Sequence, residues 1–191
     1  MAAVTKTKAI AIFILIAGTL LYFKSVLYPP VSPWEKHHQA GLSAYSKNNY
    51  PEAEKHFKDA LTEAEKLPTG NWRLTLTLGN LAEVYRFQSL HPQAEPYYHR
   101  LLDIAEKQFG ADHPNVAAHL NNLAANYRAQ GKLAEAEPLY KRALAIWEKN
   151  LGPDNPLTLF ALKNYVDLLL EMGRNDEAER YHPRLDALVD E

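Results

Sequence analysis

The chain has 191 residues, a formal net charge of -2 and no cysteine. The absence of cysteine excludes disulfides, thiolate zinc sites, c-type haem attachment and a thiol nucleophile. Its 21 basic and 23 acidic residues nearly balance. The chain therefore lacks the excess positive charge that displaces counterions from phosphates, and we do not expect a nucleic-acid partner.

A run without charged residues, "AIAIFILIAGTLLYF", occupies positions 9–23. Fifteen helical residues would cover about 22 Å of a hydrocarbon core about 30 Å thick, and extension to Tyr28 gives a full span. We therefore expect a cytoplasmic N-terminus (1–8), a transmembrane signal anchor (9–28) and a semi-rigid proline-rich linker (29–33). A cleaved signal peptide is the alternative, although no small-x-small cleavage site follows the run.

The distribution of lysine predicts the orientation of this anchor. Lys6, Lys8 and the amino terminus precede the run, whereas Lys24 and Lys36 flank it more loosely on the other side. Positive charge favours the cytoplasmic side of a membrane span. We therefore expect a single-pass inner (cell) membrane protein whose remaining residues lie on the periplasmic or extracytoplasmic side.

From position 34 onward the chain repeats itself with a period of 41 or 42 residues. The segments "NNYPEAEKHFKDAL", "SLHPQAEPYYHRLL", "GKLAEAEPLYKRAL" and "GRNDEAERYHPRLD" align on one alanine column. The turn "FGADHP" likewise recurs as "LGPDNP". A fixed period of this size indicates a repeat architecture. The alanine column consists of Ala53, Ala94, Ala136 and Ala178, and the expected repeats are 34–74, 75–116, 117–158 and 159–191.

Each repeat reads as two helices, most clearly in the third copy. Pro114 suits the first turn of a helix, and Gly131 ends that helix. Gly152 ends the second helix, so the recurring turn joins a helix stop to a helix start. Small residues occupy positions where the paired helices must approach closely: Gly41, Ala82 and Ala124 in first helices, and the alanine column in second helices.

The segment from His113 to Pro156 resembles the tetratricopeptide repeat, in the 42-residue form found in kinesin light chains and many bacterial proteins. The resemblance covers about 150 residues. It implies an all-α, right-handed superhelical solenoid of about four helix-turn-helix repeats, preceded here by one transmembrane helix, with first helices lining a concave groove. The family pattern of small, aromatic and small residues is matched by Ala53, Phe57 and Ala60; Ala94, Tyr98 and Leu101; and Ala136, Tyr140 and Ala143.

Two regions depart from the family pattern. The first junction, "LPTGNWRLT", lacks the glycine, acid and proline order. In the fourth copy Val166 and Leu169 replace the usual small residue and tyrosine, and Pro183 interrupts the second helix. No polar capping helix follows, so we expect a loose end whose apolar face needs a partner or a second copy of the chain. Residues near that face are Leu162, Leu168 and Leu185.

The sixth position of the repeats, which falls in the first helix, holds an amide in every copy. Asparagine costs about half a kcal/mol relative to alanine inside a helix, so its recurrence suggests a use. An amide can hold a peptide backbone, or it can bridge adjacent helices of the stack. Arginines in the twelfth column suit carboxylate recognition or simple solvation. The expected partner-binding groove comprises Gln39, Asn80, Glu83, Arg86, Asn122, Arg128, Lys163, Asn164 and Asp167.

The sequence does not predict an enzyme. It has no nucleophile motif, phosphate-binding glycine loop or HExxH. His37 with His38, and Glu95 with His99, offer two ligands each, fewer than a metal site needs. We therefore expect no cofactor or metal, and a membrane-anchored scaffold or assembly factor that binds a protein or peptide partner through the groove. The alternative is a constitutive accessory subunit of a membrane complex, docked by its anchor and one end of the solenoid.

Overall fold

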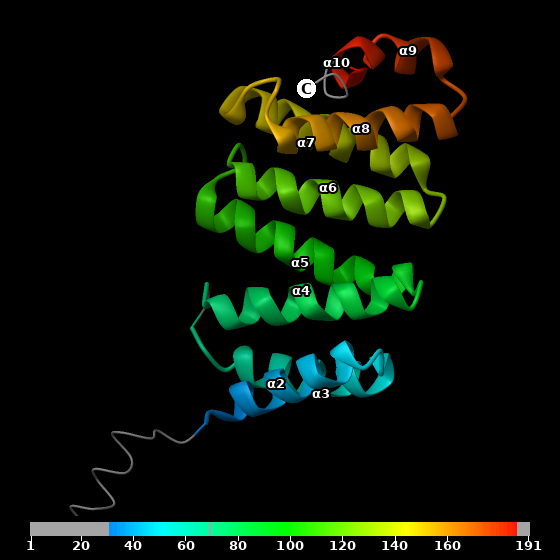
Figure 1. Cartoon of the computed structure of the whole chain (residues 1–191). Helices are drawn as coiled ribbons and strands as arrows, with labels where there is room; N and C mark the ends of the chain where they lie inside the picture. Colours follow the sequence, from blue (N-terminus) through cyan, green and yellow to red (C-terminus); the bar gives the residue numbers. More distant parts are fainter. Residues whose placement is uncertain (1–30, 69, 187–191) are drawn as a thin grey trace, which may run out of the picture.

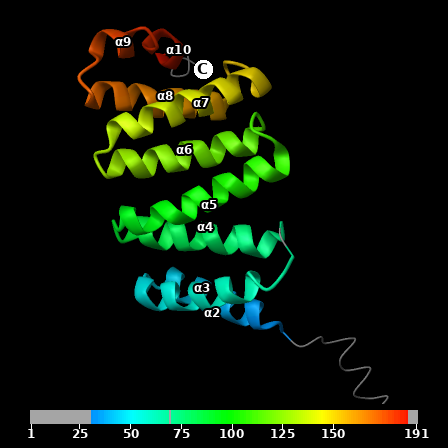
Figure 2. The ribbon, with the colours of Figure 1, turned by 180° about the vertical axis from the view of Figure 1, so that it is seen from behind.

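The computed structural model describes residues 31–68 and 70–186, and all regular structure in these ranges is helical (Figure 1). Consecutive helices lie side by side and stack from α2 and α3 at one end to α9 and α10 at the other (Figures 1 and 2). The all-α repeat architecture is thus confirmed. The helices are α2 (Pro33–Ser46), α3 (Tyr50–Ala64), α4 (Trp72–Phe87), α5 (His91–Phe109), α6 (Pro114–Ala129), α7 (Leu133–Leu151), α8 (Pro156–Glu171), α9 (Asn175–Glu179) and α10 (His182–Asp186).

The recurring turn ends one helix and begins the next, as the sequence predicts. Gly110 and Gly152 follow α5 and α7 with φ of 88° and 90°, a backbone conformation that glycine adopts without strain. His113 and Asn155 then cap α6 and α8, because their side chains accept hydrogen bonds from backbone N–H groups of the first turn. Local chemistry therefore fixes where second helices stop and first helices start.

The core lies between the helices of each pair and between neighbouring pairs. The four members of the alanine column are fully buried, and Phe57, Tyr98 and Tyr140 lie beside them, no more than 4% exposed. Gly41 allows the closest approach: a Cβ atom there would lie 2.6 Å from the Phe57 ring. The small residues of the repeat are therefore needed because helix backbones and aromatic rings meet at these positions.

A recurring polar contact joins each second helix to the first helix of the next repeat. The hydroxyl of Tyr85 donates to Glu54 at 2.8 Å, and that of Tyr127 donates to Glu95 at 3.2 Å. Burial raises the pKa of Tyr85 to about 12. In the last repeat, where leucine replaces this tyrosine, Arg174 binds Glu137 instead at 2.8 Å.

The C-terminal end differs from the loose apolar face that the sequence predicts. The second helix is indeed divided, and Pro183 occupies the second position of α10, where it is tolerated. However, Leu162 and Leu168 are fully buried. The expectation of an apolar face at these residues is wrong, because both leucines lie in the hydrophobic core, as their counterparts Leu78 and Val84 do in α4. The short helix α10 also folds back onto α8 (Figure 1). An ion pair of 2.7 Å between Arg184 and Glu148 holds it there.

Within residues 31–68 and 70–186, no helix combines the length and apolar character needed to cross a bilayer. The anchor expected over 9–28 lies outside the described residues, as do positions 1–8 and the start of the linker.

Candidate protein-binding surface

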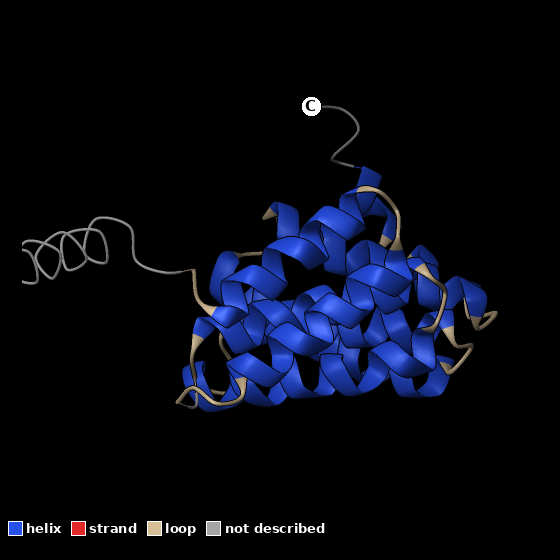
Figure 3. Cartoon of the chain, turned by 90° about the horizontal axis from the view of Figure 1, so that it is seen from below, coloured by secondary structure: helices blue, strands red, loops and turns tan. Residues whose placement is uncertain are grey.

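One face of the stack is built from first helices. Four positions spaced by four, three and four residues fall on one side of an α-helix, and in each first helix all four are half-buried or exposed. Figure 3 views the stack from its α2–α3 end. We name these positions the first-helix face. They are Glu35, Gln39, Leu42 and Ser46 in α2; Leu76, Asn80, Glu83 and Phe87 in α4; Ala118, Asn122, Ala125 and Ala129 in α6; and Phe160, Asn164, Asp167 and Glu171 in α8.

A small hollow of about 100 Å³ lies between α2 and α4 on this face. Leu42, Tyr45 and Phe57 give it apolar walls, and Asn80 and Glu83 add polar groups. The side-chain nitrogen of Asn80 is buried and has no hydrogen-bond partner among the described residues. A buried donor without a partner carries a desolvation cost of about 1–3 kcal/mol. A ligand in this hollow can bond to that donor once rotation of the Asn80 side chain exposes it.

A larger hollow, of about 280 Å³, occupies the equivalent place between α6 and α8. Its lining includes Arg128, Tyr140, Asn164 and Glu171. Nε of Arg128 donates to Glu171 at 3.0 Å, and this interaction lowers the pKa of Glu171. The hollow thus combines an amide with a neutralised ion pair.

The charged residues predicted for the groove are largely paired with one another. Arg86 donates to Glu83 at 2.7 Å. Lys163 donates to Asp167 at 2.9 Å, and that carboxylate also lies 3.8 Å from Arg128. The arginines are therefore not free to bind a partner carboxylate without first losing an internal one.

The asparagines of the sixth column have different environments. Asn164 donates to Asn121 at 2.9 Å, so it bridges α6 and α8, as the structural alternative expects. Asn122 is exposed and makes none of the side-chain hydrogen bonds found among the described residues, and Gln39 is also exposed. Sequence reasoning missed Asn121, which is 4% exposed. The adjacent asparagines of "LNNL" are the one signal that could have indicated it.

Exposed apolar side chains distinguish the first helices from the second helices. In the described part of the chain, second helices expose large apolar side chains only at their last residues, Phe109 and Leu151. The first helices α2, α4 and α8 together expose seven large apolar side chains, whereas α6 exposes none. Sequence reasoning missed this feature because it followed the polar columns, although Leu76 and Phe160 share one column, four positions before the asparagines. The exposed set is Leu42, Trp72, Leu76, Phe87, Leu157, Phe160 and Leu170.

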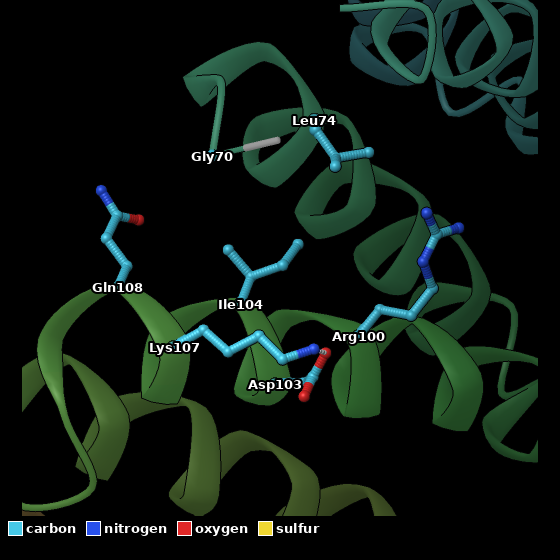
Figure 4. A pocket seen from close by; sticks show the side chains of 7 residues that line it. All are labelled: Gly70, Leu74, Arg100, Asp103, Ile104, Lys107 and Gln108. Atoms are coloured by element: carbon cyan, nitrogen blue, oxygen red, sulfur yellow. Dashed lines mark hydrogen bonds and ion pairs between the residues drawn. The ribbon is translucent and has the colours of Figure 1, made fainter. Parts of the chain in front are cut away.

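A separate hollow of about 570 Å³ opens at the irregular first junction (Figure 4). It forms because α3 has 15 residues whereas α5 and α7 have 19, so the stack lacks about one helical turn there. Leu74 of α4 and Ile104 of α5 lie on opposite sides of this hollow (Figure 4). Lys107 and Asp103, which also line it, form an ion pair of 2.6 Å. The first junction therefore has a recess, lined by polar and apolar residues, that is separate from the first-helix face.

These features define a solenoid of helix pairs with an accessible, partly apolar face. The tetratricopeptide repeat model matches residues 73–148 and 116–184, more than half of the chain. The chain belongs to the tetratricopeptide repeat family. Domains of this fold typically act as non-catalytic scaffolds for protein interaction. No curated protein sequence matches the chain.

Solved structures agree with this fold. A kinesin light chain protein from Podospora anserina, described as having nearly identical TPR-like repeats, is 19% identical to this chain and superposes with a TM-score of 0.72. The match covers 89% of this chain and 82% of that chain. BtubC (BKLC) from P. vanneervenii is 24% identical with a TM-score of 0.67, over 77% and 58%. The Rap conjugation gene regulator of plasmid pLS20, in complex with the Phr* peptide, is 15% identical with a TM-score of 0.62, over 81% and 42%.

Proposed function

We propose that the protein is a membrane-anchored scaffold or assembly factor that binds a segment of a partner protein across the first-helix face. The observation that carries this proposal is the concentration of exposed apolar side chains on first helices. Clustered apolar exposure marks interaction sites in soluble domains. The family's general role in protein interaction supports the same conclusion.

The composition of the first-helix face favours recognition of backbone and apolar groups over recognition of charge. The middle of the face carries small side chains, which leave space for a bound segment. These are Ala118, Ala125 and Ala129. The unpaired donor of Asn80 and the exposed amide of Asn122 suit peptide groups. The pLS20 regulator binds the Phr* peptide on a similar fold, which provides a precedent for the fold alone.

A test of this surface compares polar substitutions on two faces. The double variant Leu76→Ser and Phe160→Ser removes exposed apolar groups from the first-helix face. We expect it to lose the partners that co-purify with the full chain in mild detergent, because apolar anchors usually carry binding energy. Leu151→Ser is the matched control, since Leu151 is exposed at the end of a second helix. Equal loss in the control, or full retention in the double variant, would contradict the proposal.

The amides provide a second prediction. The double variant Asn80→Ala and Asn122→Ala should weaken binding of an identified partner by about 1–3 kcal/mol, because peptide groups of the ligand are then left unpaired. The melting temperature should not fall, because neither side chain has a hydrogen-bond partner to lose among the described residues, and removal of the buried donor of Asn80 and the higher helix propensity of alanine both favour the folded state. Gln93→Ala, an exposed amide on a second helix, is the control. Unchanged affinity with a lowered melting temperature would assign the asparagines to the stack instead.

A constitutive accessory subunit is the second candidate function. The recess between Leu74 and Ile104 favours it, because it offers a neighbouring subunit a contact away from the first-helix face. The two functions differ in what co-purifies with the chain. A fixed stoichiometric set of partners supports an accessory subunit, whereas a changing population supports a scaffold.

We further propose that residues 9–28 anchor the chain in an inner membrane with the repeats on the periplasmic side. The proposal rests on the charge-free run and on Lys6 and Lys8 before it. Protease added to intact spheroplasts should then degrade the repeats. Protection of the repeats while a periplasmic marker is cut would reverse the orientation.

A further inference from the structure

Three potential metal ligands meet where the helices of the first repeat pack together. His37 lies on α2, and His56 and Asp59 lie on α3. One ring nitrogen of each histidine and a carboxylate oxygen of Asp59 all lie within 4.8 Å of one another. His56 and Asp59 are three residues apart and so lie on the same side of α3. The packing of α2 against α3 brings His37 to that side.

The distances are close to those of a metal-binding set. Ligand atoms about 2.0–2.1 Å from a tetrahedral zinc ion are about 3.4 Å apart. Nδ1 of His37 and Oδ2 of Asp59 are already 3.6 Å apart. The side chains of His37, His56 and Asp59 are 32%, 25% and 49% exposed. All three are partly exposed, so side-chain rotation is available to bring their ligand atoms closer together.

A further carboxylate orients one of the histidines. Nε2 of His56 lies 3.1 Å from Glu52, one helical turn earlier. Nδ1 of the same ring is buried and has no hydrogen-bond partner among the described residues. Histidines that bind metals usually donate their second ring N–H to a carboxylate, a carbonyl or water. The His56 ring therefore has one nitrogen oriented by Glu52 and one nitrogen without an assigned role.

We propose that His37, His56 and Asp59 form a site for a divalent transition-metal ion, with Zn²⁺ as the first candidate. Two imidazoles and a carboxylate suit zinc, whereas Mg²⁺ and Ca²⁺ prefer oxygen ligands only. Three protein ligands leave a fourth position for water or for a donor from another molecule. The ion would cross-link α2 to α3 at the first repeat. This proposal is independent of the function proposed for the first-helix face.

Zinc titration of the full chain in mild detergent, in competition with a chromophoric chelator, tests the site directly. We expect one Zn²⁺ per chain and no competition from Mg²⁺. Glu52→Gln removes a group that only orients a ligand, so it should weaken zinc binding by roughly 10–100-fold. His37→Gln and His56→Gln each remove a ligand, so they should weaken zinc binding by more than this. His182→Gln removes an exposed histidine outside the cluster and is the control.

Thermal unfolding is the second readout. An ion that binds only the folded state at about 100 times its dissociation constant should raise the melting temperature of the wild type by roughly 5–10 °C. Without zinc, the His37 and His56 variants should melt close to the melting temperature of the zinc-free wild type. Added zinc should raise their melting temperatures little. Equal zinc affinity in wild type and both variants, or no zinc-dependent rise in the wild type, would overturn the proposal. The cluster would then be an interhelical polar contact only.

Discussion

Substitution of Phe57 by alanine should lower the free energy of unfolding of the first repeat by about 3–5 kcal/mol. Phe57 is 1% exposed, and its ring centroid lies 5.8 Å from that of the His38 ring. The same ring forms part of the wall of the hollow between α2 and α4. Its removal leaves a cavity that these neighbours cannot fill. Because repeats contact only their neighbours, we expect the loss to be greatest in α2 and α3. Urea unfolding with amide exchange measures both its size and its location.

Lys55→Ala is the control for this substitution. Lys55 lies on the same helix, but its side chain is 66% exposed, and alanine preserves helix propensity. Its effect should remain within about 0.5 kcal/mol. A Phe57→Ala variant that loses less than about 1 kcal/mol would show that the ring does not fill the first repeat as described.

Substitutions of two helical glycines by alanine should have opposite effects. Gly41→Ala should lower the free energy of unfolding by about 1–2 kcal/mol, because the added Cβ would lie 2.6 Å from the buried Phe57 ring and overpacking outweighs the gain in helix propensity. Gly79→Ala should raise it by about 0.5–1 kcal/mol, because a Cβ there meets nothing within 4 Å. Thermal and urea unfolding of the two variants would compare them directly.

A double-mutant cycle identifies the cause of the Gly41 effect. In a Phe57→Ala background the clash is absent, so Gly41→Ala should become neutral or stabilising. A penalty of the same size in both backgrounds would show that the ring is not what limits the space at Gly41.

Local features of the sequence determined much of this fold. The glycines at 110 and 152 stop helices because of their positive φ, and His113 and Asn155 begin the next helices by capping them. Such signals act over a few residues, and their recurrence 42 residues apart makes them visible after the second and third repeats. The helix pairs and the buried alanine column could therefore be predicted from the sequence.

Contacts between helices could not be predicted in the same way. A repeat column indicates which face a residue occupies, but not which side chain it meets, because that depends on the register and spacing of packed helices. Only the tertiary structure pairs Asn164 with Asn121 and brings His37 to His56 across 19 positions of sequence. It also places Leu162 and Leu168, which the sequence predicted to be near an exposed face, in the hydrophobic core. The sequence determined the repeating unit, and the packing between units decided which polar and apolar groups remain available for binding.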